Sequence, residues 1–118
     1  MFKKLSLIIC ILLVGGMNYA GNLIHNDDIT ILASNTVGND KSSSISASIN
    51  GNTLTVVFTE NLGNVDVEIT NAFGAIMSFA SLETPTGYQF FITIPGQYTI
   101  TFTLPNGDEY YGNFVVTN

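Results

Sequence analysis

The amino-acid sequence predicts an all-β protein, an antiparallel β-sandwich of about seven strands. After residue 44, short segments in which apolar and polar residues alternate follow one another along the chain. Gly, Asn and Pro separate these segments at intervals of about 8–12 residues, as turns do in β-sandwiches. No window after the first twenty residues shows the 3.6-residue apolar period of an amphipathic helix.

Alternation and turn chemistry place each strand. Asn50-Gly51-Asn52 is a strong tight-turn signal, because Asn and Gly tolerate positive φ. Val65, Val67 and Ile69 alternate with polar residues in the clearest half-buried strand. The predicted strands cover residues 45–49, 54–58, 65–69, 75–82, 88–94, 98–104 and 110–116.

The first twenty residues have the layout of a secretory signal peptide. Lys3 and Lys4 precede an apolar run from Leu5 to Val14, and Ala20 offers a small residue for cleavage, although a cut after Gly16 also fits. A membrane span needs roughly 20 apolar residues, about twice the length of this run. Residues 1–20 therefore predict an exported protein, periplasmic or secreted, that has no membrane span.

Cys10 is the only cysteine. Residues 7–10 superficially resemble a lipoprotein box, but Ile9 stands where such boxes carry a small residue, and the apolar run continues to Val14. We therefore interpret Cys10 as an ordinary residue of the signal peptide and not as a lipid anchor. The exported chain then has no cysteine, which excludes disulfides and thiolate chemistry.

Charge and residue types exclude further functions. Without residues 1–20, Lys41 is the one basic residue against nine acids, a side-chain charge of −8. Binding to nucleic acid or to an anionic membrane needs clustered Lys and Arg. His25 is the only histidine, so neither a Ser-His-Asp triad nor a His-rich metal site is expected. We predict no enzyme, no catalytic residues, no cofactor and no metal, although a weak surface calcium site at Asn106, Asp108 and Glu109 stays open.

The exported chain has two parts. Residues 21–44 are rich in Asn, Asp, Gly and Ser and form a leader, with a predicted short strand at 29–33 that docks on a sheet edge, either its own or a neighbour's. Residues 45–118 form the sandwich. In it, Asp66 and Glu68 alternate with apolar neighbours, which places both carboxylates on the solvent face of a strand and not in a catalytic cleft.

Several spaced motifs also resemble a known family. They are Ile45-x-Ala47-x-Ile49-x-Gly51-Asn52, Leu62-Gly63-Asn64-Val65, Pro95-Gly96-x-Tyr98 and Asn106-Gly107-x-x-x-Tyr111-Gly112-x-Phe114. Together they resemble the domain-of-unknown-function family 3244, small exported proteins of Bacteroidales bacteria. The resemblance implies an immunoglobulin-like β-sandwich and no established activity, and it brings no catalytic residues. The layout is more distantly similar to the C-terminal tail domains of type IX secretion, but Val115-Val116-Thr117-Asn118 lacks the basic residues usual at their end.

Four aromatic residues are the candidate contacts. Phe73 lies in a predicted turn, Phe91 is out of phase with Phe90, and Tyr110 and Tyr111 are adjacent, so both cannot face one core. We expect an exported, non-enzymatic module for protein–protein interaction at the cell envelope, acting through loop tips or an edge strand. The alternative is a glycan-binding module that uses these rings. Neither the partner nor the oligomeric state follows from the sequence.

Overall fold

The computed structural model describes residues 26–117, so the predicted signal peptide, Cys10 and His25 lie outside the described residues. The described chain forms nine strands and one 3₁₀ turn, η1 (Ser42–Ser44). The strands are β1 (Asn26–Ile29), β2 (Leu32–Asn35), β3 (Ile45–Asn50), β4 (Thr53–Phe58), β5 (Asn64–Asn71), β6 (Ile76–Glu83), β7 (Thr86–Phe91), β8 (Gly96–Thr103) and β9 (Glu109–Val116).

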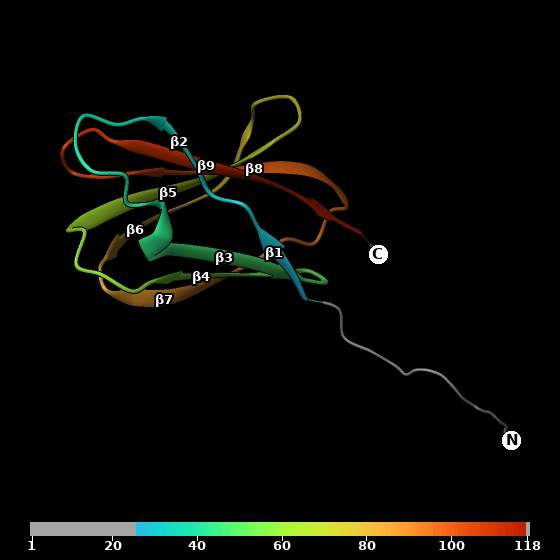
Figure 1. Ribbon diagram of the computed structural model, residues 1–118. Coiled ribbons are helices and arrows are strands. Elements are labelled where there is room, and N and C mark those ends of the chain that lie inside the picture. Colours follow the sequence, from blue (N-terminus) through green and yellow to red (C-terminus); the bar gives the residue numbers. More distant parts are fainter. Residues whose placement is uncertain (1–25, 118) are drawn as a thin grey trace, which may run out of the picture.

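Two antiparallel sheets face each other (Figure 1). We call the sheet with the order β1-β3-β4-β7 sheet A and the sheet with the order β2-β9-β8-β5-β6 sheet B. Consecutive strands form the hairpins β3-β4, β5-β6 and β8-β9, and β7 returns from sheet B to the edge of sheet A beside β4. The protein is therefore an all-β sandwich, as the sequence predicted.

The core lies between the sheets and follows the alternation of the sequence. On β5 the apolar side chains of Val65, Val67 and Ile69 are fully buried, while Asp66 between them is exposed. Phe58 of sheet A packs edge-on against Phe102 of sheet B, with ring centroids 5.8 Å apart. Side chains of a strand point alternately to opposite faces, so each strand contributes one apolar face to the core.

The leader differs from its prediction in detail. The expected strand at 29–33 is divided in two, because the chain crosses from one sheet to the other at Thr30 and Ile31. β1 pairs with β3 at the edge of sheet A, and β2 pairs with β9 at the edge of sheet B. Ile29 is buried in the core, and Ile31 packs against it. The leader thus docks on the edges of its own domain, one strand to each sheet.

Gly112 of β9 allows the leader to cross so closely. A β-carbon at this position would lie 2.6 Å from Cγ2 of Ile29 and 3.0 Å from the carbonyl oxygen of Thr30. Glycine inside a strand often marks a place where another backbone approaches. The absence of a side chain at residue 112 therefore makes room for the leader.

The strand expected over residues 88–94 ends earlier than its alternation predicts. β7 stops at Phe91, and Ile92 is buried without belonging to a strand. The backbone N–H of Ile92 donates a hydrogen bond to the carbonyl oxygen of Asn52, and the side-chain amide of Asn52 donates one back to the carbonyl of Ile92. The β3-β4 turn thus binds the chain after Phe91 and directs it toward sheet B.

Candidate functional site

The two ends of the sandwich have different surfaces. Asn71, which closes β5, pairs with Tyr98 near the start of β8, so the β5-β6 turn and the β7-β8 connection leave the sheets at the same end. The opposite end carries the connections β2-β3, β4-β5, β6-β7 and β8-β9 (Figure 1). We call the first the apolar end and the second the polar end, for the reasons that follow.

Large apolar side chains gather at the apolar end without being buried. Phe91 is 71% exposed and Ile94 59% exposed. Both line a hollow of about 130 Å³, together with Met77 of β6. The buried residues Ile92 and Tyr98 also line this hollow. The β5-β6 turn at this end adds Phe73, which is 94% exposed, and β6 begins with the exposed Ile76.

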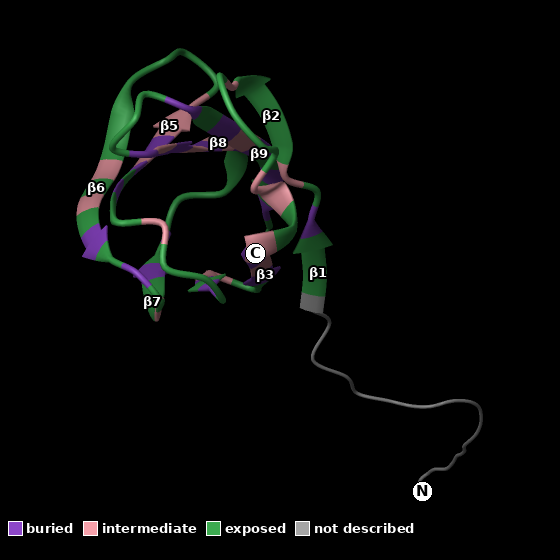
Figure 2. Ribbon diagram, turned by 60° about the vertical axis from the view of Figure 1, so that its left-hand side comes forward, coloured by how far each residue is buried: buried purple, intermediate pink, exposed green. Residues whose placement is uncertain are grey.

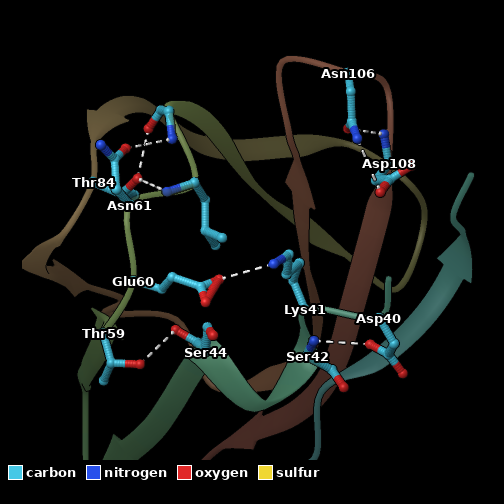
Figure 3. Close-up of polar contacts among 12 residues, drawn as sticks. Asp40, Lys41, Ser42, Ser44, Thr59, Glu60, Asn61, Thr84, Asn106 and Asp108 are labelled. Carbon is cyan, nitrogen blue, oxygen red and sulfur yellow. Dashed lines mark hydrogen bonds and ion pairs between the residues drawn. The ribbon is translucent and has the colours of Figure 1, made fainter. Parts of the chain in front are cut away.

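At the polar end, polar groups of different loops form hydrogen bonds and an ion pair with one another (Figure 3). Thr84 donates through its hydroxyl to the carbonyl of Gly63 and accepts from the backbone N–H of Leu62, both at 2.7 Å. Lys41 forms an ion pair with Glu60, with 3.3 Å between Nζ and Oε1. The loops at this end are thereby tied to each other. A hollow of about 310 Å³ lies among them, lined in part by Leu62, Pro105 and Asn106.

Asp108 is the buried acid of the polar end, at 2% exposure. Its Oδ1 accepts a hydrogen bond from the backbone N–H of Val37 at 2.8 Å, and its Oδ2 accepts one from the side-chain amide of Asn106 at 3.2 Å. Both carboxylate oxygens therefore serve the loop structure. Among residues 26–117, no group of three or more His, Cys, Asp or Glu side chains could hold a metal ion.

Asp40 has the one clear electrostatic shift at this end. The backbone N–H of Ser42 donates to its Oδ1 at 2.8 Å, and the Ser42 side chain adds a second hydrogen bond. Both favour the charged carboxylate, so the pKa of Asp40 lies below its ordinary value. This bond fixes the chain just before η1 and indicates a structural role.

The carboxylates of β5 do not form a catalytic pair. Asp66 and Glu68 lie on the outer face of sheet B, where Asp66 accepts a hydrogen bond from the hydroxyl of Ser81 at 2.9 Å. Their cross-strand neighbours on β8 are Thr103 and Thr101, and neither acid lines the hollows described above. Glycoside hydrolysis needs two carboxylates that flank a bound sugar in a cleft. Asp66 and Glu68 line no such cleft.

The structure separates the four predicted contact residues. Phe73 and Phe91 are exposed and lie at the apolar end. Tyr110 does not fit a contact role, because its ring is fully buried and its hydroxyl accepts a hydrogen bond from the backbone N–H of Lys41 at 2.8 Å. Tyr111 is half-buried on β9, opposite Leu32 of the leader, and so lies apart from the apolar end. Alternation alone could not tell which member of the tyrosine pair faces the core.

Met77 and Ile94 were missed by the sequence reasoning. Ile94 continues the alternation of Tyr88, Phe90 and Ile92, so it reads as a core residue, whereas Met77 lies within the predicted strand 75–82 and carries no signal of its own. Two local departures expose them: Ile94 follows the early end of β7, and the register of β5 and β6 shifts between Ile69 and Thr70, just where Met77 lies on β6. Such shifts depend on backbone geometry that the side-chain pattern does not encode.

Comparison with known proteins supports the fold. A protein of the domain-of-unknown-function family 3244 from Bacteroides vulgatus, whose crystal structure has an immunoglobulin-like β-sandwich fold, matches with a TM-score of 0.67 and 14% sequence identity. The match covers 79% of this chain and 100% of that one. The fold is an immunoglobulin-like β-sandwich. No protein-family model matches the sequence, and no curated protein matches it.

This immunoglobulin-like sandwich is the fold that the resemblance to family 3244 implied. The similarity to type IX tail domains is not tested by the match and stays a prediction. Within residues 26–117, no helix is long and apolar enough to cross a membrane.

Exposed residues in Figure 2 cover much of β6 and β7, the two strands at the side of the sandwich away from β1 and β2.

Proposed function

We propose that this protein is an exported, non-enzymatic interaction module of the cell envelope, and that its apolar end binds a partner protein. The observation that carries this proposal is the exposure of Phe91, Ile94 and Met77 around one hollow. The opposite end satisfies its polar groups internally. The layout of residues 1–20 supports export.

The chemistry of the apolar end fits a protein partner. Aromatic residues and Met are enriched in protein interfaces, and charged residues are depleted at their centres. The hollow beside Phe91 is lined by Met77 and Ile94, and a flexible Met adapts to differently shaped side chains. The hollow can thus accommodate one apolar side chain of a partner, and the exposed rings around it would be removed from water on binding.

The test is capture of partners by the exported protein from an envelope extract of its own cells. Phe91→Lys and Ile94→Lys each place a charge at the hollow, and we expect them to abolish recovery of a partner that the unaltered protein retains. Val37→Lys is the matched control, because Val37 is an equally apolar, exposed residue at the polar end. If no partner is retained, or if Val37→Lys removes it as completely, the proposal fails.

Glycan binding is the second candidate, and the exposure of Phe73 and Phe91 favours it. Exposed aromatic faces can stack on sugar rings. A glycan array probed with the unaltered protein, Phe73→Ala and Phe91→Ala separates the two candidates. A signal that both variants lose supports glycan binding, whereas a signal indifferent to both, or none at all, removes it.

A further inference from the structure

We propose that the outer edge of β6 binds an extended, positively charged segment of the partner protein, which adds to sheet B as a further strand. This inference rests on the proposed function, because it specifies the chemistry of the partner and its mode of binding. Four observations carry it: the state of the sheet edges, the direction of the backbone groups of β6, the acids beside it, and its continuity with the apolar end.

β6 is the least protected edge of the sandwich. The edges of sheet A are β1 and β7, and those of sheet B are β2 and β6. β1 has four residues and carries Asp27 and Asp28, β2 has four residues and a register shift, and β7 has six residues directly after Pro85. β6 has eight residues and a single charge, Glu83, at its end, and its register shift lies at its start, which leaves residues 78–83 in regular pairing with β5. Proteins usually shorten, charge, interrupt or cover an edge to prevent strand addition.

The hydrogen-bond pattern leaves β6 backbone groups directed outward. The N–H of Thr84 donates to the carbonyl of Gly63, which fixes the phase of the antiparallel ladder between β5 and β6. In such a ladder, hydrogen-bonded and non-bonded pairs alternate. Leu82 and Ala80 therefore bond to β5, while the N–H and C=O groups of Phe79, Ser81 and Glu83 point away from the sheet. These three residues offer the template for an added strand.

Acidic side chains flank this template on the outer face of sheet B. Asp66 lies opposite Ser81, and Glu68 lies opposite Phe79. A strand added to β6 would lie about 10 Å from β5, so a Lys or Arg opposite Ser81 could reach over the small Ser81 side chain to Asp66. Glu83 adds a further exposed acid on β6 itself. Lys41 is the one basic side chain among residues 26–117, and it lies at the polar end, paired with Glu60.

The edge continues into the apolar end. Phe79, 59% exposed, stands on the same strand as Met77, which lines the hollow beside Phe91. A partner strand along β6 would direct alternate side chains to the two faces of sheet B. Its basic residues would lie on the outer face, beside Phe79 and the acids of β5, and its apolar residues on the inner face, beside Ala80 and Leu82. Alternation of apolar and basic residues is therefore the chemistry that this edge fits.

A capped peptide in which valine and lysine alternate is the probe, and the same peptide with glutamate in place of lysine is its control. We expect the lysine peptide to bind the exported protein more weakly as salt rises, and the glutamate peptide not to bind. Binding should slow amide hydrogen exchange at Phe79, Ser81 and Glu83, measured by NMR. Equal binding of both peptides, absence of binding, or protection confined to other strands overturns the inference.

Ser81→Pro tests the edge itself. Proline removes an N–H that points away from β5, so the ladder to β5 is kept, while the peptide should bind about three to ten times more weakly for the lost hydrogen bond. Ser81→Ala is the matched control, because it removes the hydroxyl bonded to Asp66 but keeps the N–H. Asp66→Asn combined with Glu68→Gln should flatten the salt dependence. If Ser81→Pro does not fold, amide exchange of the unaltered protein with the peptide bound still shows whether the peptide adds to β6.

The two proposals fail separately. If Phe91→Lys abolishes capture of the envelope partner and Ser81→Pro leaves it unchanged, the apolar end binds protein and the strand addition is wrong. If Ser81→Pro and the paired acid substitutions weaken capture while Phe91→Lys does not, the edge is the binding surface and the apolar end is not.

Discussion

The backbone N–H of Val37 donates a 2.8 Å hydrogen bond to Oδ1 of Asp108, which joins the leader loop to the β8-β9 turn across 71 residues of sequence. Asp108 is almost completely buried, and its own N–H and second oxygen bond to Asn106. The carboxylate is thus enclosed by donors from two segments. Its place in the turn motif Pro105-Asn106-Gly107-Asp108 does not show that it also holds the leader.

Asp108→Ala should destabilise the protein by about 1–3 kcal/mol, because the N–H of Val37 loses its acceptor in a partly buried place. Urea unfolding of the exported protein measures the change. Asp108→Asn should have a smaller effect, since it keeps an oxygen for Val37 but turns an amide toward the amide of Asn106. An unchanged unfolding free energy for Asp108→Ala would contradict the structural role.

Gly112→Ala should displace the leader from β9. The new methyl group would lie 2.6 Å from Cγ2 of Ile29 and 3.0 Å from a backbone oxygen, so the leader must move away. We expect a loss of about 1–3 kcal/mol, typical of overpacking, and faster amide exchange in β1 and β2 than in β5. Gly38→Ala is the control, because nothing lies within 4 Å of its new methyl group. Equal behaviour of the two variants would show that the leader does not pack on Gly112.

Deletion of residues 21–35 should expose the edges of β3 and β9, which β1 and β2 cover. The core would lose Ile29, worth about 1.5–3 kcal/mol when fully buried. The uncovered strands should also self-associate, which sedimentation detects as concentration-dependent oligomers. Deletion of residues 21–25 alone keeps both strands and serves as the control. A shortened chain that stays monomeric and equally stable would show that the leader does not protect the sheets.

The β-sandwich could be predicted because apolar and polar residues alternate along most of its strands, and burial follows this alternation. Val65, Val67 and Ile69 on β5, and Ile100 and Phe102 on β8, are all fully buried as their alternation predicts. The path of the leader was harder to predict, because Thr30 and Ile31 look like the middle of one strand. Their crossing between the sheets depends on the space beside Gly112, which is remote in sequence. Glycine inside a predicted strand was the one local signal for this contact.

The candidate surface was predicted only in part. Phe73 stood out because it lies in a predicted turn and Phe91 because it is out of phase with Phe90, and both are exposed. Met77, Phe79 and Ile94 are exposed as well. Phe79 shares the outer face of sheet B with Glu68, Met77 lies at the register shift of β6, and Ile94 follows the early end of β7 at Phe91. Strand order and strand ends arise from pairing between distant segments, so a single-strand pattern does not reveal which apolar residues lack a covering layer.

The carboxyl of Asp40 should titrate below its ordinary value of 3.8, because Ser42 hydrogen-bonds to its charged form. The stabilisation from this group is therefore complete above the unfolded pKa and is lost as pH falls through the lower folded pKa. An NMR titration of the Asp40 carboxyl measures the shift. Ser42→Ala removes the side-chain bond but keeps the larger backbone contribution, so the pKa should rise only part of the way. A full return in Ser42→Ala would contradict the leading role of the backbone N–H.

Phe102→Ala should be the most damaging of these substitutions. Phe102 is fully buried and packs edge-on against Phe58 across the two sheets, so its loss leaves a cavity at the centre of the sandwich. Large-to-small changes of this kind cost about 3–5 kcal/mol. Thr101→Ala, one residue away on the outer face of sheet B, should change stability by less than about 0.5 kcal/mol. Urea unfolding of both variants measures these losses in the free energy of unfolding. If Phe102→Ala loses as little as Thr101→Ala, the main contact between the sheets lies elsewhere.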